Sequence, residues 1–300
     1  MQQSCSTTRR AIVGLLAAAA LAAAAPAAGQ SVIQQIGEDF GNAGKDMWFI
    51  WTSPLHGSAH DWGTFALATA AVAGTGAFDE RIDAYIRRHP SSTFVTGIEK
   101  FRDRGEFALA DFGSARYLQP VAGGLYVLGL AFGSRTLRDA GMGCAAAYEA
   151  GNVVRTLVYT GVARTRPVAS PDDPYRFDVP GGEWETHSFF GGHAANIMSC
   201  VAFWNARFHM GPAEPVLVLL ATGIALGRMA DHVHWASDTM VGMLFGYAVG
   251  RNVGIRSLRR AQDEDGEKAG APAPTGVAAP SGPLIAPGEH GLLLRWRMTF

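Results

Sequence analysis

The chain has 300 residues, of which 48% are hydrophobic and 17% are charged. This is enough apolar material to bury a sizeable core as one domain with extensions. The formal net charge of −1 provides no strongly basic surface, so we expect no nucleic-acid partner.

The N-terminus is typical of an export signal. Arg9 and Arg10 precede an apolar run from Ala11 to Ala25 that is too short for a comfortable membrane span, and small residues follow it. The paired arginines fit an ordinary charged leader better than a twin-arginine address. We therefore predict a signal peptide over residues 1–29 and an exported protein, either periplasmic or in the cell envelope.

After a lead-in over residues 30–60, the chain indicates helices with almost no strand signal. Most of the helical segments are apolar on nearly all sides, as in the middle of a bundle or in a bilayer. The sequence thus predicts an all-α fold over residues 61–256, a bundle of about six core helices with the active site at one end. The expected helices are Trp62–Phe78, Ser91–Arg104, Tyr117–Gly133, Leu137–Thr160, His193–Phe208, Glu214–Arg228 and Ser237–Val253.

Three segments lack a helical pattern. Residues 168–187 are rich in proline and acidic residues, which predicts a loop between two core helices. Residues 257–287 are rich in Ala, Pro, Gly and charged residues and cannot bury enough apolar surface to fold, so we expect a disordered linker. Residues 288–300 end in a partly alternating stretch, for which we expect an edge strand docked on the domain.

Cysteine usage gives little information about the fold. Cys5 precedes the apolar leader, which leaves Cys144 and Cys200 in the mature part. Two cysteines are too few for a disulfide framework. A single bridge between them is one option, and two buried free thiols are the interpretation that we favour.

Two short runs around the predicted loop contain residues that suit a phosphate. Arg164 and Arg166 follow a core helix, and the planar donor fork of a guanidinium matches phosphate oxygens. Gly191 and Gly192 come before His193 at the start of the next helix. Unpaired backbone N–H groups and the helix dipole attract anions at such a position.

A third run lies between the last two core helices. Arg228 ends one helix, His234 follows in the connection, and Asp238 begins the next helix, where Ser237 and Asp238 also suit a helix cap. Two successive helical hairpins would present all three runs at the same end of the bundle. We therefore expect a phosphate pocket there.

These runs resemble the signature of the type 2 phosphatidic acid phosphatase superfamily, which also contains bacterial acid phosphatases and vanadium haloperoxidases. The family pattern is Lys, six residues and Arg-Pro, then Pro-Ser-Gly-His, then Ser-Arg, five residues, His, three residues and Asp. The resemblance spans about residues 60–255. The residues that match, with the spacings kept, are Arg166 and Pro167, Gly192 and His193, and Arg228, His234 and Asp238.

Four positions depart from this pattern. The residues that stand in for the lysine, the proline and the two serines are Tyr159, Phe190, Gly191 and Gly227. Loss of an ammonium group and of a hydroxyl donor should weaken phosphate binding. Arg155, one helical turn before Tyr159, and Arg164 are two candidates for the missing cation.

The resemblance implies a phosphatase that works through a phosphohistidine. His234 would attack phosphorus, Asp238 would orient its ring, and His193 would protonate the leaving oxygen and then activate water. This scheme requires no metal and no cofactor. The residues expected to hold the phosphate are Arg166, Arg228, Gly192, Gly191, Arg164 and Tyr159.

The expected substrate is a phosphate monoester or a lipid phosphate or pyrophosphate, so the partner is a phosphorylated small molecule or lipid. Two alternatives remain open. One is a vanadate-dependent haloperoxidase-like enzyme with vanadate as its cofactor, and the other is a degenerate member of the family that binds phosphate without catalysis. The altered positions weaken the anion site, which makes the vanadate alternative the less favoured of these functions.

Membrane contact is a separate question. Apolar stretches and the arginines after the last core helix favour membrane spanning, whereas the short length of these stretches, about 15 to 18 residues, disfavours it. We expect an exported domain that is soluble or peripherally attached to a membrane, with an integral membrane enzyme as the other option.

Overall fold

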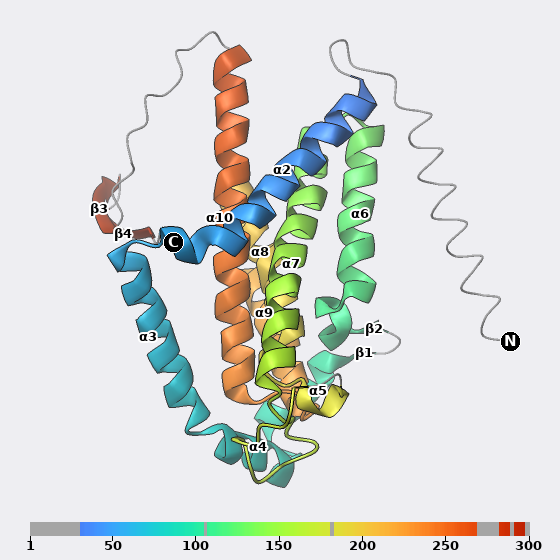
Figure 1. Ribbon diagram of the computed structural model, residues 1–300, viewed down its shortest axis with the longest axis vertical. Coiled ribbons are helices and arrows are strands. Elements are labelled where there is room, and N and C mark those ends of the chain that lie inside the picture. Colours follow the sequence, from blue (N-terminus) through green and yellow to red (C-terminus); the bar gives the residue numbers. More distant parts are fainter. Residues whose placement is uncertain (1–30, 105–106, 181–182, 269–281, 289–290, 298–300) are drawn as a thin grey trace, which may run out of the picture.

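The computed structural model describes residues 31–104, 107–180, 183–268, 282–288 and 291–297 (Figure 1). Most of these residues are helical, which confirms the all-α prediction. The predicted signal peptide lies outside the described residues. In chain order the helices are α2 (Val32–Thr52), α3 (Ala59–Gly76), α4 (Asp79–Arg88), α5 (Thr93–Arg102), α6 (Ala115–Ala131), α7 (Arg135–Val162), α8 (Gly192–Phe208), α9 (Ala213–Ala230) and α10 (Ala236–Lys268), with short 3₁₀ helices η1 (Ser53–His56), η2 (Leu109–Gly113) and η3 (Trp184–Thr186).

The strands are short and lie outside the bundle core. β1 (Asp103–Arg104) pairs antiparallel with β2 (Phe107–Ala108). Near the C-terminus, β3 (Gly282–Gly288) pairs antiparallel with β4 (Gly291–Arg297), so a hairpin forms from the expected edge strand and from the end of residues 257–287, for which a disordered linker was expected.

The pair α8 and α10 forms the centre of the bundle. Glycines recur every four residues along one face of α10, and a Cβ atom added at Gly246 or Gly250 would collide with the carbonyl oxygen of Ala195 or Ser199 in α8. Only a residue without a side chain allows two helix backbones to approach so closely. The full stripe consists of Gly242, Gly246, Gly250 and Gly254.

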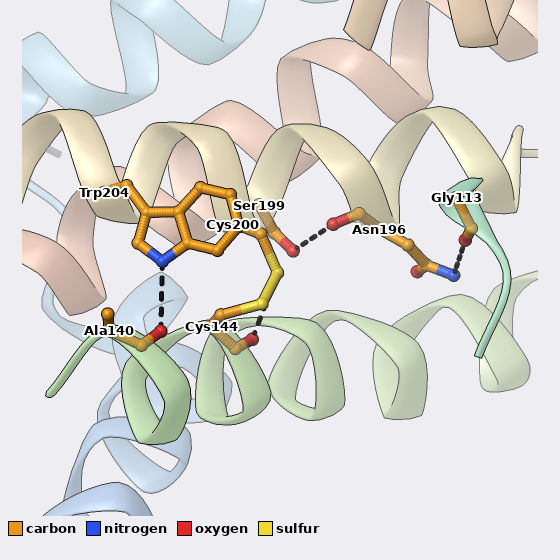
Figure 2. Close-up of a disulfide and its surroundings, with 7 residues drawn as sticks. All are labelled: Gly113, Ala140, Cys144, Asn196, Ser199, Cys200 and Trp204. Carbon is orange, nitrogen blue, oxygen red and sulfur yellow. Dashed lines mark hydrogen bonds between the residues drawn. A yellow bond between two sulfur atoms is a disulfide. The ribbon is translucent and has the colours of Figure 1, made fainter. Parts of the chain in front are cut away.

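A disulfide joins α7 to α8. Cys144 and Cys200 are fully buried, and their Cα atoms are 4.5 Å apart (Figure 2). The expectation of two free thiols is therefore wrong, because the packing of the two helices places the thiols side by side, and this cannot be read from a cysteine count. One turn farther along α8, Trp204 Nε1 donates a hydrogen bond of 3.0 Å to the Ala140 carbonyl oxygen.

Two helices were not among those expected, and one is longer than expected. α2 forms within the predicted lead-in, and α4 is so highly charged that it gives little apolar periodicity. α10 continues to Lys268, past the boundary expected at residue 256. Charge pairing explains this extension, because Arg256 and Arg260 donate hydrogen bonds of 2.6 to 2.8 Å to the buried Asp46 of α2.

Apolar side chains are exposed on the outside of the bundle. α3 has no buried residue, and its first half exposes Trp62, Phe65 and Leu67. Among the described helices, only α9 has the length and composition to cross a membrane, and 22% of it is buried within the molecule. A single helix of this kind is weak evidence for a span, because core helices of soluble proteins have the same properties.

Candidate active site

The three runs that suit a phosphate meet at one end of the bundle. α7 and α9 end there, and α8 and α10 begin there, at the lower end of Figure 1. The loop after α7 carries Arg164 and Arg166, while the connection between α9 and α10 carries His234. Alternating helix directions therefore bring together residues that are up to 74 positions apart, as in the contact between Arg164 and Asp238.

Arginine side chains surround His193 in the first turn of α8. Burial, together with the charges of Arg228, Arg155 and Arg166, lowers the pKa of His193 to about 3. Burial also lowers the pKa of Arg166 to about 10, with Arg228 and Arg155 contributing repulsion. The three guanidinium groups therefore share one small, electropositive site, and His193 is neutral there at pH 7.

Arg166 is fixed by backbone carbonyls. Its Nε donates to the Trp184 oxygen at 2.7 Å and its Nη1 to the Val233 oxygen at 2.9 Å. The guanidinium carbon also lies 4.3 Å from the centroid of the Trp184 ring. These contacts leave the guanidinium positive and hold its orientation, as a preorganised anion ligand requires.

Arg228 has an unsatisfied donor. Its Nη1 lies 3.2 Å from Asp231 Oδ2 and 3.8 Å from Asp111 Oδ1. Its Nε is buried and has no hydrogen-bond partner within the described part of the chain. A buried guanidinium N–H without an acceptor is costly, and an anion bound between Arg228 and Arg166 would satisfy it.

His234 is oriented by a backbone carbonyl. Its ring is buried, and Nδ1 lies 2.7 Å from the Ser188 carbonyl oxygen. Because a carbonyl oxygen only accepts, Nδ1 carries the proton and Nε2 carries the lone pair. Burial, with the charges of Arg166 and His193 next in size, holds the pKa of His234 well below its usual range. The ring is thus a neutral imidazole with Nε2 available as a nucleophile.

Asp238 does not contact His234 as the sequence analysis expected. Its carboxylate is fully buried and accepts from Arg164 Nη1 and Ser188 Oγ, each at 2.5 Å, and from the Trp235 N–H at 3.1 Å. The link to the His234 ring is indirect, since Asp238 fixes Ser188 and the Ser188 carbonyl accepts from the ring. Asp238 is the third residue of α10, and its bond from Trp235 satisfies the backbone N–H of the residue that precedes the helix.

Arg164 does not face the phosphate site as expected. Its Nε donates to the Pro174 oxygen at 2.8 Å, and its two terminal nitrogens donate to Asp238, Ser237 and Asp79. The buried guanidinium therefore neutralises two buried carboxylates beneath the site. These contacts join the loop after α7 to α4 and α10.

The glycines and Tyr159 differ in what they can offer an anion. The Gly191 N–H donates to the Asp238 carbonyl oxygen at 2.9 Å, so it is not free for a phosphate. A Cβ atom on Gly191 would lie 3.2 Å from that oxygen, so a larger residue there would require a small shift of the neighbouring backbone. Gly192 and His193, in the first turn of α8, present N–H groups that have no acceptor within the helix. Tyr159 lies in the last turn of α7, with its ring centroid 4.2 Å from that of His187.

Three residues of α4 that support this site were not predicted from the sequence. Asp79 accepts from the Ser237 N–H at 2.9 Å, and Asp83 Oδ1 lies 2.6 Å from His232 Nδ1. Arg87 Nη2 donates to the Pro167 oxygen at 3.0 Å. The only sequence signal for these residues was the spacing of Asp79 and Asp83, four residues apart and beside an apolar position. The solvent-exposed surface of a helix has the same pattern.

Sequence comparison agrees with the motifs. The family model described as the PAP2 superfamily matches residues 141–257, a range that contains all three runs. No curated protein and no solved structure matches the chain. Within the described residues, no group of three or more His, Cys, Asp or Glu side chains is arranged to hold a metal ion. The match supports the resemblance of the three runs to the type 2 phosphatidic acid phosphatase (PAP2) superfamily over the segment 141–257, which carries the site.

Proposed function

We propose that the protein is a phosphatase that hydrolyses a phosphate monoester through a phosphohistidine. The family supports phosphatase chemistry in general. The observation that carries the specific proposal is the buried Arg228 Nε without an acceptor, in a cluster with Arg166 and two neutral histidines. Such a cluster is incomplete without an anion, and it holds an unprotonated imidazole beside the anion position.

The chemistry follows from the protonation states of the two histidines. Nε2 of His234 attacks phosphorus and forms an N–P bond while the ester P–O bond breaks. His193, protonated once the anion is bound, donates its proton to the leaving oxygen. It then takes a proton from water, whose oxygen attacks phosphorus, breaks the N–P bond and releases inorganic phosphate. Arg166, Arg228 and the Gly192 N–H stabilise the charge on the phosphoryl oxygens.

Lipid phosphates fit the surroundings of the site better than small soluble esters. The last turn of α3 reaches the catalytic loops, since Tyr175 donates to the Gly76 oxygen at 3.0 Å and Thr75 Oγ1 lies 3.1 Å from Met240 Sδ. Both α3 and α9 end beside the site, and their exposed apolar side chains lie farther along these helices, away from the site. We propose that these faces contact a membrane and the acyl chains of a lipid phosphate.

We also propose that the protein works outside the cytoplasm. The buried disulfide between Cys144 and Cys200 is a feature of proteins that fold in an oxidising compartment. This agrees with the predicted signal peptide and with a periplasmic or cell-envelope location.

His234→Ala tests the proposed reaction. Removal of the nucleophile should lower kcat by about 10³-fold or more, because the covalent route is lost. The assay uses p-nitrophenyl phosphate and phosphatidic acid in mixed micelles, and His56→Ala, at an exposed position in η1, is the matched control. Equal activity of the wild type and His234→Ala would contradict the proposal. A preference for the soluble ester would contradict the proposed lipid substrate alone.

A further inference from the structure

The first motif of this chain lacks the cation that the PAP2 pattern places at position 159. Tyr159 is there instead, and a neutral phenol cannot pair with a phosphate oxygen as an ammonium does. Two arginines were candidates for the missing charge. Arg164 is committed to Asp79 and Asp238, as described above.

Arg155 lies where the missing cation is needed. It is on α7, one turn before Tyr159, and its Cδ, Nε and Nη1 atoms lie 3.1, 3.2 and 3.3 Å from the position of a Cβ atom on Gly192. Its guanidinium therefore packs against the first turn of α8, beside the N–H groups that suit an anion. Its charge also reaches the neighbouring site residues, because it lowers the pKa of both His193 and Arg166.

Neutral partners hold Arg155 in this place. Nε and Nη2 donate to Asn152 Oδ1 at 3.3 and 2.8 Å. The guanidinium carbon lies 4.7 Å from the Tyr159 ring centroid. The hydrogen-bond partners of Arg155 within the described residues thus carry no negative charge, in contrast to those of Arg164. Burial lowers the pKa of Arg155, which an anion would oppose.

We propose that Arg155 is the third guanidinium of the phosphate site and replaces the lysine of the family pattern, with Tyr159 and Asn152 as positioning residues. The bound group is the phosphoryl group of the substrate or inorganic phosphate, so the inference rests on the proposed function only for the chemical class of the ligand. In this arrangement the Tyr159 ring covers one face of the Arg155 guanidinium and orients its N–H groups towards Gly192.

Binding of inorganic phosphate, measured by isothermal titration calorimetry, tests this inference without turnover. Arg155→Met should weaken phosphate binding at least about tenfold, since it removes one charge-assisted pair. Arg116→Met is the matched control, because Arg116 is exposed and its guanidinium carbon lies 5.7 Å from the Tyr117 ring centroid. It should bind phosphate like the wild type.

A rescue variant makes the test specific. The double variant Arg155→Met/Tyr159→Lys places a lysine at position 159, as in the family pattern. We expect it to regain more than half of the phosphate affinity that Arg155→Met loses, measured as the logarithm of Kd. Arg155→Gln keeps a hydrogen-bonding side chain without the charge and is used if thermal melting shows that the methionine variants are unfolded.

The outcomes separate this inference from the proposed function. If the wild type binds phosphate and folded Arg155→Met or Arg155→Gln binds it equally well, the role of Arg155 is contradicted even if the enzyme is active. Failure of the wild type to bind phosphate overturns it as well. If Arg155→Met loses affinity but no ester is hydrolysed by the wild type, the inference stands and the proposed hydrolysis fails.

Discussion

At the scale of single residues, two arginines near the site differ in the charge of their partners. Arg164 is neutralised by Asp79 and Asp238, whereas Arg155 has neutral hydrogen-bond partners and lies beside His193. Only the second arrangement leaves a charge to attract an anion. A motif that records residue types and spacings cannot distinguish these two arginines, because the difference lies in carboxylates from α4 and α10.

His193 should take up a proton when an anion binds. Its pKa is held at about 3 by burial and three arginines. One negative charge at about 4 Å contributes about 4 kcal/mol at an effective dielectric constant near 20, which corresponds to about three pKa units. The bound anion therefore raises the pKa of His193, and sulfate, which keeps its own charge, should bind with proton uptake at pH 5 that disappears as the pH rises above the pKa of the bound state.

Calorimetry in buffers of different ionisation enthalpy measures this uptake. Proton uptake makes sulfate affinity rise as the pH falls below the pKa of the bound state, because the bound state holds one more proton than the free state. His193→Gln should abolish both the uptake and this pH dependence. The absence of a buffer effect on the wild type at pH 5 would contradict the assigned charge states.

At the scale of elements, the glycine stripe of α10 determines where the site residues meet. Gly246→Ala would place a methyl group against the Ala195 carbonyl oxygen, so the helices must separate, and we expect a loss of about 1–3 kcal/mol in the free energy of unfolding. Gly266→Ala in the same helix is the matched control, since no atom lies within 4 Å of its added Cβ. It should stabilise α10 by about 0.5–1 kcal/mol. Urea denaturation measures both changes, and equal effects of the two substitutions would exclude close packing at the stripe.

At the scale of the whole molecule, helical periodicity and helix-end signals were sufficient to predict the bundle and the end of it that carries the site. Apolar repeats identified α6 to α9 to within a few residues, because each of them packs in the bundle. α4 was missed because its buried positions include Asp79 and Asp83, whose partners outside the helix are more than 80 residues away in the chain. The indirect link from Asp238 to His234 was missed for a similar reason, since a backbone carbonyl, that of Ser188, leaves no pattern in a sequence.

The disulfide stabilises the folded molecule because it lowers the conformational entropy of the unfolded chain. It links α7 to α8 across 56 residues, and the loop-closure entropy of such a crosslink corresponds to about 4 kcal/mol at 25 °C. Cys144→Ser/Cys200→Ser should therefore lower the free energy of unfolding by about this amount in urea denaturation. Reduction of the wild type with dithiothreitol should give a similar loss, and Cys144→Ala/Cys200→Ala controls for the buried hydroxyl groups.

Because the crosslink lies two turns from His193 along α8, the folded fraction of each variant should retain phosphate binding. A loss below about 1 kcal/mol in all three cases would mean that helix packing alone fixes α7 against α8.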